Sequence, residues 1–232
     1  MDEKTTRGAY VKDLHALEGE VLELGRRVAV AIREGLHVLE SRDQAGACAL
    51  IAGDASINEL RYHIEEHCLK LLATQQPMAG DLRRVTAVLH IASDLERMGD
   101  QAEGIGKIVL LLGTAPLIKP LIDIPRLTGV VLEMLDAAMA AFSRWDGEGA
   151  RAIALRDDEA DRLHNVIDHD LFHIMVGDPS KITQATYLMW VSHNLERIAD
   201  LVTNVCEQVV FVSTGSIEEL NVRRVCDTKP RD

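Results

Sequence analysis

Two stretches of this chain, one hundred residues apart, are close copies of each other. Ala92–Asp100 reads ASDLERMGD, and Ser192–Asp200 reads SHNLERIAD. Both contain Leu-Glu-Arg followed, three residues after the arginine, by an aspartate. Self-similarity at a fixed spacing indicates a structural unit that is built more than once. The chain is therefore expected to fold as two related units, and this constrains the fold before any local pattern is considered.

Upstream of these segments, the spacing of the repeat changes from 100 to 103 residues. Asp43 then matches Asp146, and Asp54 matches Asp157. Three additional residues around Gln75-Gln76-Pro77 account for the change, as a loop between two helices would. The predicted parts are a first unit at 8–113, a second unit at 121–213, and a polar tail at 214–232 that we expect to be mobile.

Apolar residues recur every three to four positions nearly throughout the chain, which is the period of an amphipathic helix. Val85, Val88, Ala92 and Leu95 form one such stripe. No segment shows the alternation expected of a strand. Aromatic residues make up only 3% of the chain, so the core must be aliphatic, which suits helix-on-helix packing. We predict an all-α fold of two tandem, sequence-related three-helix bundles.

Proline marks the helix boundaries, because its φ angle is fixed and it has no backbone donor. Gln76-Pro77 and Asp178-Pro179 separate the second helix from the third in the two units. In the second unit, the aspartate is expected to be the N-cap, with proline at the first helical position. The first helices are expected at about 11–42 and 123–145. All six helices are predicted to be long and unbroken.

Composition excludes several classes of partner. The net charge of −12 argues against nucleic acid, whose phosphates require a basic surface. No apolar run reaches the roughly 18 residues that would indicate a membrane span, and the N-terminus lacks the apolar core of a signal peptide. We therefore expect a cytoplasmic protein without a transmembrane segment. The cysteines contain no Cys-x-x-Cys pair, so reduced thiols are expected instead of a thiolate zinc site: Cys48, Cys68, Cys206 and Cys226.

The repeated segment carries a pair of carboxylates four residues apart, Glu96 and Asp100 in the first unit and Glu196 and Asp200 in the second. Residues at this spacing share one helix face, where like charges repel unless a cation lies between them. If the second and third helices pack antiparallel, further oxygen donors join each pair. Such surfaces suit Mg²⁺, Mn²⁺, Fe or Zn²⁺. The additional candidates are Asp54 in the first unit and Asp157, Asp161 and Asn204 in the second.

Two other interpretations of these residues remain open. The acidic rows could be solvated helix faces with local ion pairs. Histidine pairs that resemble zinc-protease motifs also occur, at His63 and His67 and at His169 and His173. The two pairs are out of register in the repeat, and the second is predicted to face solvent, so a zinc protease is not expected. His193, one turn before Glu196, is a better candidate for a metal ligand.

Several of these motifs together resemble the PhoU family of phosphate-transport regulators. They are QPMAGDLR from Gln76, DLERMGD from Asp94, RDDEADRL from Arg156 and NLERIADLVTN from Asn194. The resemblance implies two three-helix bundles, a homodimer, and multinuclear iron or zinc clusters held by the Glu-x-x-x-Asp motifs, with Mn or Mg as further candidates. Gly104 replaces an asparagine and Asn58 an aspartate of the family pattern, so the second site is expected to be stronger.

The family resemblance also implies a role that is not enzymatic. It predicts a metal-binding adaptor that couples the ATPase subunit of a phosphate ABC transporter to a sensor histidine kinase. Such an adaptor would negatively regulate the phosphate-starvation response. Two alternatives remain at this point: a helical di-metal carboxylate oxidase or hydrolase, and a metal-free helical scaffold. Neither a nucleophile elbow nor a glycine-rich phosphate loop is present in the sequence.

Overall fold

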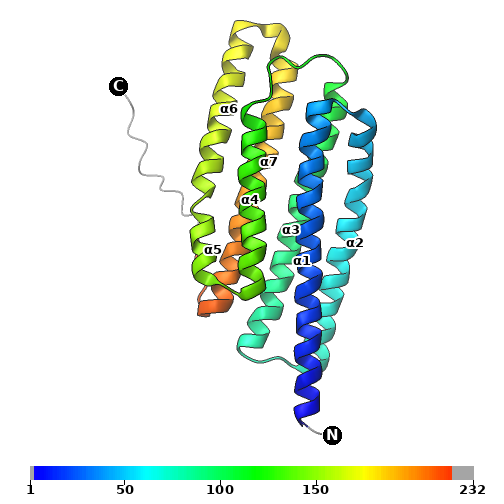
Figure 1. The fold of residues 1–232 in the computed structure, drawn as a ribbon, viewed down its shortest axis with the longest axis vertical. Helices are drawn as coiled ribbons and strands as arrows, with labels where there is room; N and C mark the ends of the chain where they lie inside the picture. Colours follow the sequence, from blue (N-terminus) through cyan, green and yellow to red (C-terminus); the bar gives the residue numbers. More distant parts are fainter. Residues whose placement is uncertain (1–2, 221–232) are drawn as a thin grey trace, which may run out of the picture.

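The computed structural model describes residues 3–220, and within these residues every regular element is a helix. The helices form two three-helix bundles side by side; in the view of Figure 1 the helices of the first run up, down and up, and those of the second run down, up and down. The first unit consists of α1 (Glu3–Ser41), α2 (Gln44–Gln75) and α3 (Gly80–Leu112). The second consists of α4 (Asp123–Arg144), α5 (Gly147–Ala154), α6 (Asp157–Gly177), a 3₁₀ turn η1 (Pro179–Lys181) and α7 (Ile182–Thr214). The predicted fold class is confirmed.

The third helices of the two units, α3 and α7, form the most extensive helix–helix contact in the described chain. They run antiparallel through the centre of the molecule (Figure 1). Leu95 on α3 and its repeat equivalent Leu195 on α7 are both almost fully buried. Burying a side chain of this size contributes about 1.5–3 kcal/mol to folding. The buried thiols of Cys68 and Cys206 also belong to the core, and burial raises the pKa of each to about 12, so both stay neutral.

The turn after the first helix has the same construction in both units. Arg42 and its equivalent Trp145 adopt left-handed φ angles of 60° and 51°. The aspartate that follows each is an N-cap: Asp43 accepts a hydrogen bond from the amide of Ala45, and Asp146 accepts one from that of Gly149. An N-cap side chain replaces one of the backbone partners that a helix start lacks. The aspartates of the repeat upstream of the carboxylate motif therefore include structural caps.

The helix boundaries differ from the sequence prediction in two places. α1 begins at Glu3 instead of near residue 11, and the buried residues Tyr10 and Leu14 continue its apolar stripe. The second helix of the second unit is broken at Leu155–Arg156 into α5 and α6, whereas α2 is continuous. Three acidic residues in the first turn of α6, Asp157–Glu159, favour a helix start at this point because they complement the helix dipole.

Other features of the fold agree with the sequence. Asp178 caps η1 through the amide of Ser180, with proline at its first position, as predicted. No helix in residues 3–220 combines the length and apolarity that a membrane span requires. Of the predicted mobile tail, the part up to residue 220 contacts the second unit: Glu218 accepts two hydrogen bonds from Arg151 at 2.8 and 2.7 Å. Residues 221–232 of this tail, with Cys226, lie outside the described residues.

The matching caps give a test of the duplicated turn. We expect Asp43→Ala and Asp146→Ala each to lower the free energy of unfolding by about 1 kcal/mol, because each removes one capping acceptor. Chemical denaturation measures the change. Asp43→Asn and Asp146→Asn are the matched controls, since asparagine retains the acceptor oxygen. If the alanine and asparagine variants lose equal stability, the capping hydrogen bonds are not what the aspartates contribute.

Candidate metal centres

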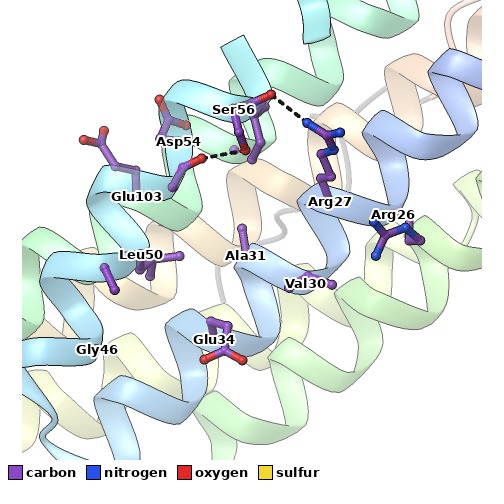
Figure 2. A pocket seen from close by; sticks show the side chains of 14 residues that line it. Arg26, Arg27, Val30, Ala31, Glu34, Gly46, Leu50, Asp54, Ser56 and Glu103 are labelled. Carbon is purple, nitrogen blue, oxygen red and sulfur yellow. Dashed lines mark hydrogen bonds between the residues drawn. The ribbon is translucent and has the colours of Figure 1, made fainter. Parts of the chain in front are cut away.

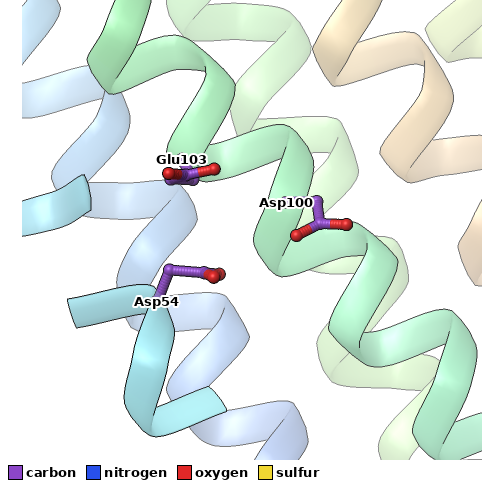
Figure 3. Close-up of side chains that lie close together, drawn as sticks. All are labelled: Asp54, Asp100 and Glu103. Atoms are coloured by element: carbon purple, nitrogen blue, oxygen red, sulfur yellow. The ribbon is translucent and has the colours of Figure 1, made fainter. Parts of the chain in front are cut away.

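The first unit brings three carboxylates together between α2 and α3. Asp54 lies on α2, while Asp100 and Glu103 lie on α3, and one oxygen of each falls within 4.8 Å of the others (Figure 3). The antiparallel packing of the two helices produces this convergence. It is the tightest acidic or histidine-containing group of its kind in residues 3–220.

Two neighbouring side chains already contact this three-carboxylate group. Asn58 donates a 2.7 Å hydrogen bond to one oxygen of Asp54, and Lys107 makes a 2.6 Å ion pair with Glu103. The second oxygen of Asp54 is buried and has no hydrogen-bond partner. Burial and the charges of Asp100 and Glu103 raise the pKa of Asp54. These observations fit a bound divalent cation, whose ligands here would be Asp54, Asp100 and Glu103.

Glu96, a predicted ligand of the first unit, lies outside the three-carboxylate group. Its pKa is raised, chiefly by burial and then by the charge of Asp100, whereas Arg61 opposes the shift. Glu103 joins the group in its place. The sequence contained the signal for this, because Glu103 lies on the same face of its helix as Glu96 and Asp100.

In the second unit, two of the predicted carboxylates lie near Glu196 of α7. Burial raises the pKa of Glu196, and the charges of Asp200 and Asp161 raise it further. Glu196 and Asp157 are both buried, at 8% and 4% exposure. These carboxylates do not form a group as tight as the one in the first unit.

Two histidines lie beside Glu196 and oppose the rise of its pKa: His164 on α6 and His193 on α7. His193 Nδ1 lies 3.4 Å from a carboxylate oxygen of Glu196. The sequence pattern did not single out His164. Its position three residues after Asp161, on the same helix face, was the available signal.

Asn204, the last predicted ligand, lies at the contact between the two units. Its side chain hydrogen-bonds to Asp94 of α3, a buried carboxylate whose pKa is raised by burial and lowered by Arg97 and by this bond. The equivalent position in the first unit is Gly104. A Cβ atom there would lie 2.8 Å from the side-chain nitrogen of Asn194. Close packing of α3 on α7 therefore supplies a reason for the glycine that is independent of metal binding.

A groove of about 400 Å³ lies between α1 and α2 and reaches the three-carboxylate group (Figure 2). It is lined by small and apolar residues such as Ala31 and Leu50, together with Asp54 and Glu103. Arg27 of α1 donates a 3.1 Å hydrogen bond to the carbonyl of Ser56 of α2. The sequence pattern does not predict this groove, because it depends on how closely α1 approaches the small residues of α2.

A family model described as PhoU domain matches the chain twice, at residues 21–109 and 124–209. The matched segments lie within the two units inferred from the repeat. The phosphate-specific transport system accessory protein PhoU homolog of Caulobacter vibrioides (strain NA1000 / CB15N) is 36% identical over 97% of this chain and 96% of that protein. The homolog with the same description from Streptococcus pneumoniae serotype 4 is 34% identical, over 93% of this chain and all of that protein.

Solved structures show the same fold. The crystal structure of the phosphate transport system regulatory protein PhoU from Streptococcus pneumoniae has a TM-score of 0.85 and 32% identity, and covers 90% of this chain and 99% of that one. The crystal structure of PhoU from Pseudomonas aeruginosa also has a TM-score of 0.85, with 27% identity. These relatives are named as accessory or regulatory proteins and not as enzymes, in agreement with the role expected from the sequence.

The crowding of negative charge in the first unit predicts a cost to stability when no cation is present. We expect Asp54→Asn to raise the free energy of unfolding of metal-free protein at neutral pH, by roughly 0.5–1 kcal/mol, because it removes a partly buried charge next to two others. Denaturation in the presence of a chelator measures this. Glu66→Gln, at an exposed position inside α2, is the control for general loss of charge. A destabilised Asp54→Asn variant would mean that the carboxylates do not repel one another in the fold.

Proposed function

The chain belongs to the PhoU family, and from this premise we propose that it is an accessory regulatory protein of a phosphate transport system. In this proposal it couples the ATPase subunit of a phosphate ABC transporter to a sensor histidine kinase, and restrains the phosphate-starvation response when phosphate is plentiful. The main support is that relatives named as phosphate-specific transport accessory proteins align with nearly the whole chain. Both units, and not one domain alone, therefore correspond to the proteins that bear this description.

Exposed apolar side chains on the second unit support the role of an adaptor. Phe172 of α6 and Trp190 of α7 are 58% and 49% exposed. Large aromatic residues of this kind often contribute most of the binding energy at protein–protein contacts. A second copy of the chain, the transporter and the kinase are the proposed partners. The acidic net charge disfavours nucleic acid as a competitor for these surfaces.

The proposed adaptor binds metal through the repeated carboxylates of both units. The convergence of Asp54, Asp100 and Glu103, with one buried oxygen that lacks a partner, supports this for the first unit. The burial of Glu196 beside Asp200 and Asp161 supports it for the second. Bound Fe or Zn, with Mn or Mg as alternatives, would offset the repulsion between these groups and hold α2 to α3 and α6 to α7.

The two centres are expected to differ in strength. Glu196→Gln/Asp200→Asn should reduce bound metal more than Glu96→Gln/Asp100→Asn does, and weaken binding roughly tenfold or more. The reason is that Asn58 and Lys107 already partly satisfy the carboxylates of the first unit, and a nearby cation opposes metal binding.

Elemental analysis and metal titration of untagged protein measure this difference. Parental metal content in both double variants would contradict metal binding and favour the metal-free scaffold. A larger loss in the first-unit variant would reverse the ranking, and would show that the convergence of three carboxylates matters more than the number of anionic groups.

The regulatory role has its own test. Deletion of the gene in its host should raise expression from phosphate-starvation promoters several-fold in phosphate-rich medium, because the restraint on the kinase is removed. A reporter fusion measures this, and a plasmid copy of the intact gene should restore repression. Unchanged expression in a confirmed deletion strain would contradict the proposed function while leaving metal binding by the protein intact.

A further inference from the structure

In the second unit, an imidazole pair continues the carboxylate rows of α6 and α7. Asp157, Asp161, His164 and Asp168 follow one another at four-, three- and four-residue spacing, so they share one face of α6. On α7, His193 precedes Glu196 by one turn, on the same face as Asp200. Because α6 and α7 run antiparallel, the two histidines come to lie opposite each other, with ring centroids 6.2 Å apart.

Each histidine already contacts a carboxylate. His164 Nε2 lies 3.6 Å from one oxygen of Asp168, and His193 Nδ1 lies 3.4 Å from one oxygen of Glu196. The other oxygen of Asp168 is buried and has no hydrogen-bond partner. Burial raises the pKa of Asp168, and both histidines oppose this rise. One imidazole and one carboxylate from each of two facing helices therefore lie next to one another, although their ligand atoms do not converge as closely as those of the three-carboxylate group in the first unit.

The ring of His164 is held in a defined orientation. Its Nδ1 atom forms a 2.8 Å hydrogen bond with the hydroxyl of Ser192, which is fully buried. Metal-binding histidines commonly use one ring nitrogen for such a hydrogen bond, which fixes the tautomer and leaves the other nitrogen free for the ion. In the tautomer in which Nδ1–H donates to Ser192, Nε2 carries the lone pair and is available to an ion on the side of Asp168.

The first unit has no counterpart of this imidazole pair. By the spacing of the repeat, Arg61 occupies the position of His164, and Ser93 occupies that of His193. Arg61 is a permanent cation that forms a 2.7 Å ion pair with Glu65. Burial raises the pKa of Glu96, and the charge of Arg61 opposes this rise. The difference between the two units is therefore chemical: one has an arginine and a serine where the other has two imidazoles.

We propose that His164, Asp168, His193 and Glu196 form a mixed nitrogen–oxygen site that gives the second unit a preference for Zn²⁺. The proposal deepens the proposed function, on which it rests for the statement that this unit binds metal. Ligand atoms about 2.0–2.1 Å from a tetrahedral zinc ion lie about 3.4 Å apart. The two histidine–carboxylate contacts, at 3.6 and 3.4 Å, are close to this value, whereas the two rings, with centroids 6.2 Å apart, have to approach each other when the ion binds. The exposed His193 side chain brings the rings together by rotating toward His164.

Nitrogen donors explain why zinc is favoured over the other cations. Imidazole suits Zn²⁺ and other later transition metals, whereas Mg²⁺ and Mn²⁺ prefer oxygen. The all-oxygen group of the first unit lacks this preference. The two units of one chain would then hold chemically different cations at equivalent positions.

The test is calorimetric titration of the metal-free, untagged full chain with Zn²⁺ and, separately, with Mn²⁺. We expect His164→Gln/His193→Gln to weaken one zinc-binding event by about 10–100-fold and to leave the Mn²⁺ titration unchanged. His169→Gln/His173→Gln removes two imidazoles from the exposed side of the same helix, and should retain the tight zinc-binding event. Co²⁺ absorption of the parent provides a second readout, since loss of nitrogen ligands changes its spectrum.

Several outcomes would overturn the proposal: an unchanged zinc titration, equal weakening for Zn²⁺ and Mn²⁺, or loss of the tight event in the exposed-pair variant. If the double variant does not fold, His193→Gln alone replaces it, because this side chain is 53% exposed. Asp157→Asn/Asp200→Asn separates this inference from the proposed function. If that variant loses metal and the imidazole variant does not, only the imidazole site is wrong; if neither loses metal, both proposals fail.

Discussion

The antiparallel contact between α3 and α7 is the constraint on which the rest of the structure depends. One side of each of these helices packs against the other unit. Another side presents carboxylates to the second helix of its own unit. The apolar stripe through Leu95 and Leu195 fixes the rotation of both helices about their axes. Once that rotation is set, Asp100 must face α2 and Glu196 must lie near α6. The core thus positions the acidic residues without any contact of its own to a ligand.

The same contact is made by polar residues as well as apolar ones. Asn204 reaches Asp94 across it, and Asn194 fills the space that the missing side chain of Gly104 leaves. A buried polar pair gives direction to an interface that apolar contacts alone would leave free to slide. The duplicated motif therefore contains positions that specify how the two units fit together, in addition to those that face the acidic centres.

The repeat was sufficient to predict the architecture, because a duplicated pattern of apolar and charged positions determines which helix face is buried. Departures from symmetry were harder to predict. The break before Asp157 depends on local charge, and the exchange of Glu96 for Glu103 depends on the exact rotation of α3. His164 acquires its significance only when α6 is packed against Ser192 and His193. The period of a sequence pattern specifies which face of a helix is buried. It does not specify which side chains come into contact when two helices pack face to face.

The break between α5 and α6 has a consequence for how a duplicated protein can diverge. In the first unit, Asp54 lies inside the continuous helix α2. In the second, Asp157 is the first residue of α6, where the helix dipole favours negative charge. Equivalent aspartates of the repeat therefore lie in two different electrostatic environments. A copy that begins a new helix at such a residue can hold more negative charge there than the uninterrupted copy, and so can acquire ligand sets that the uninterrupted copy cannot.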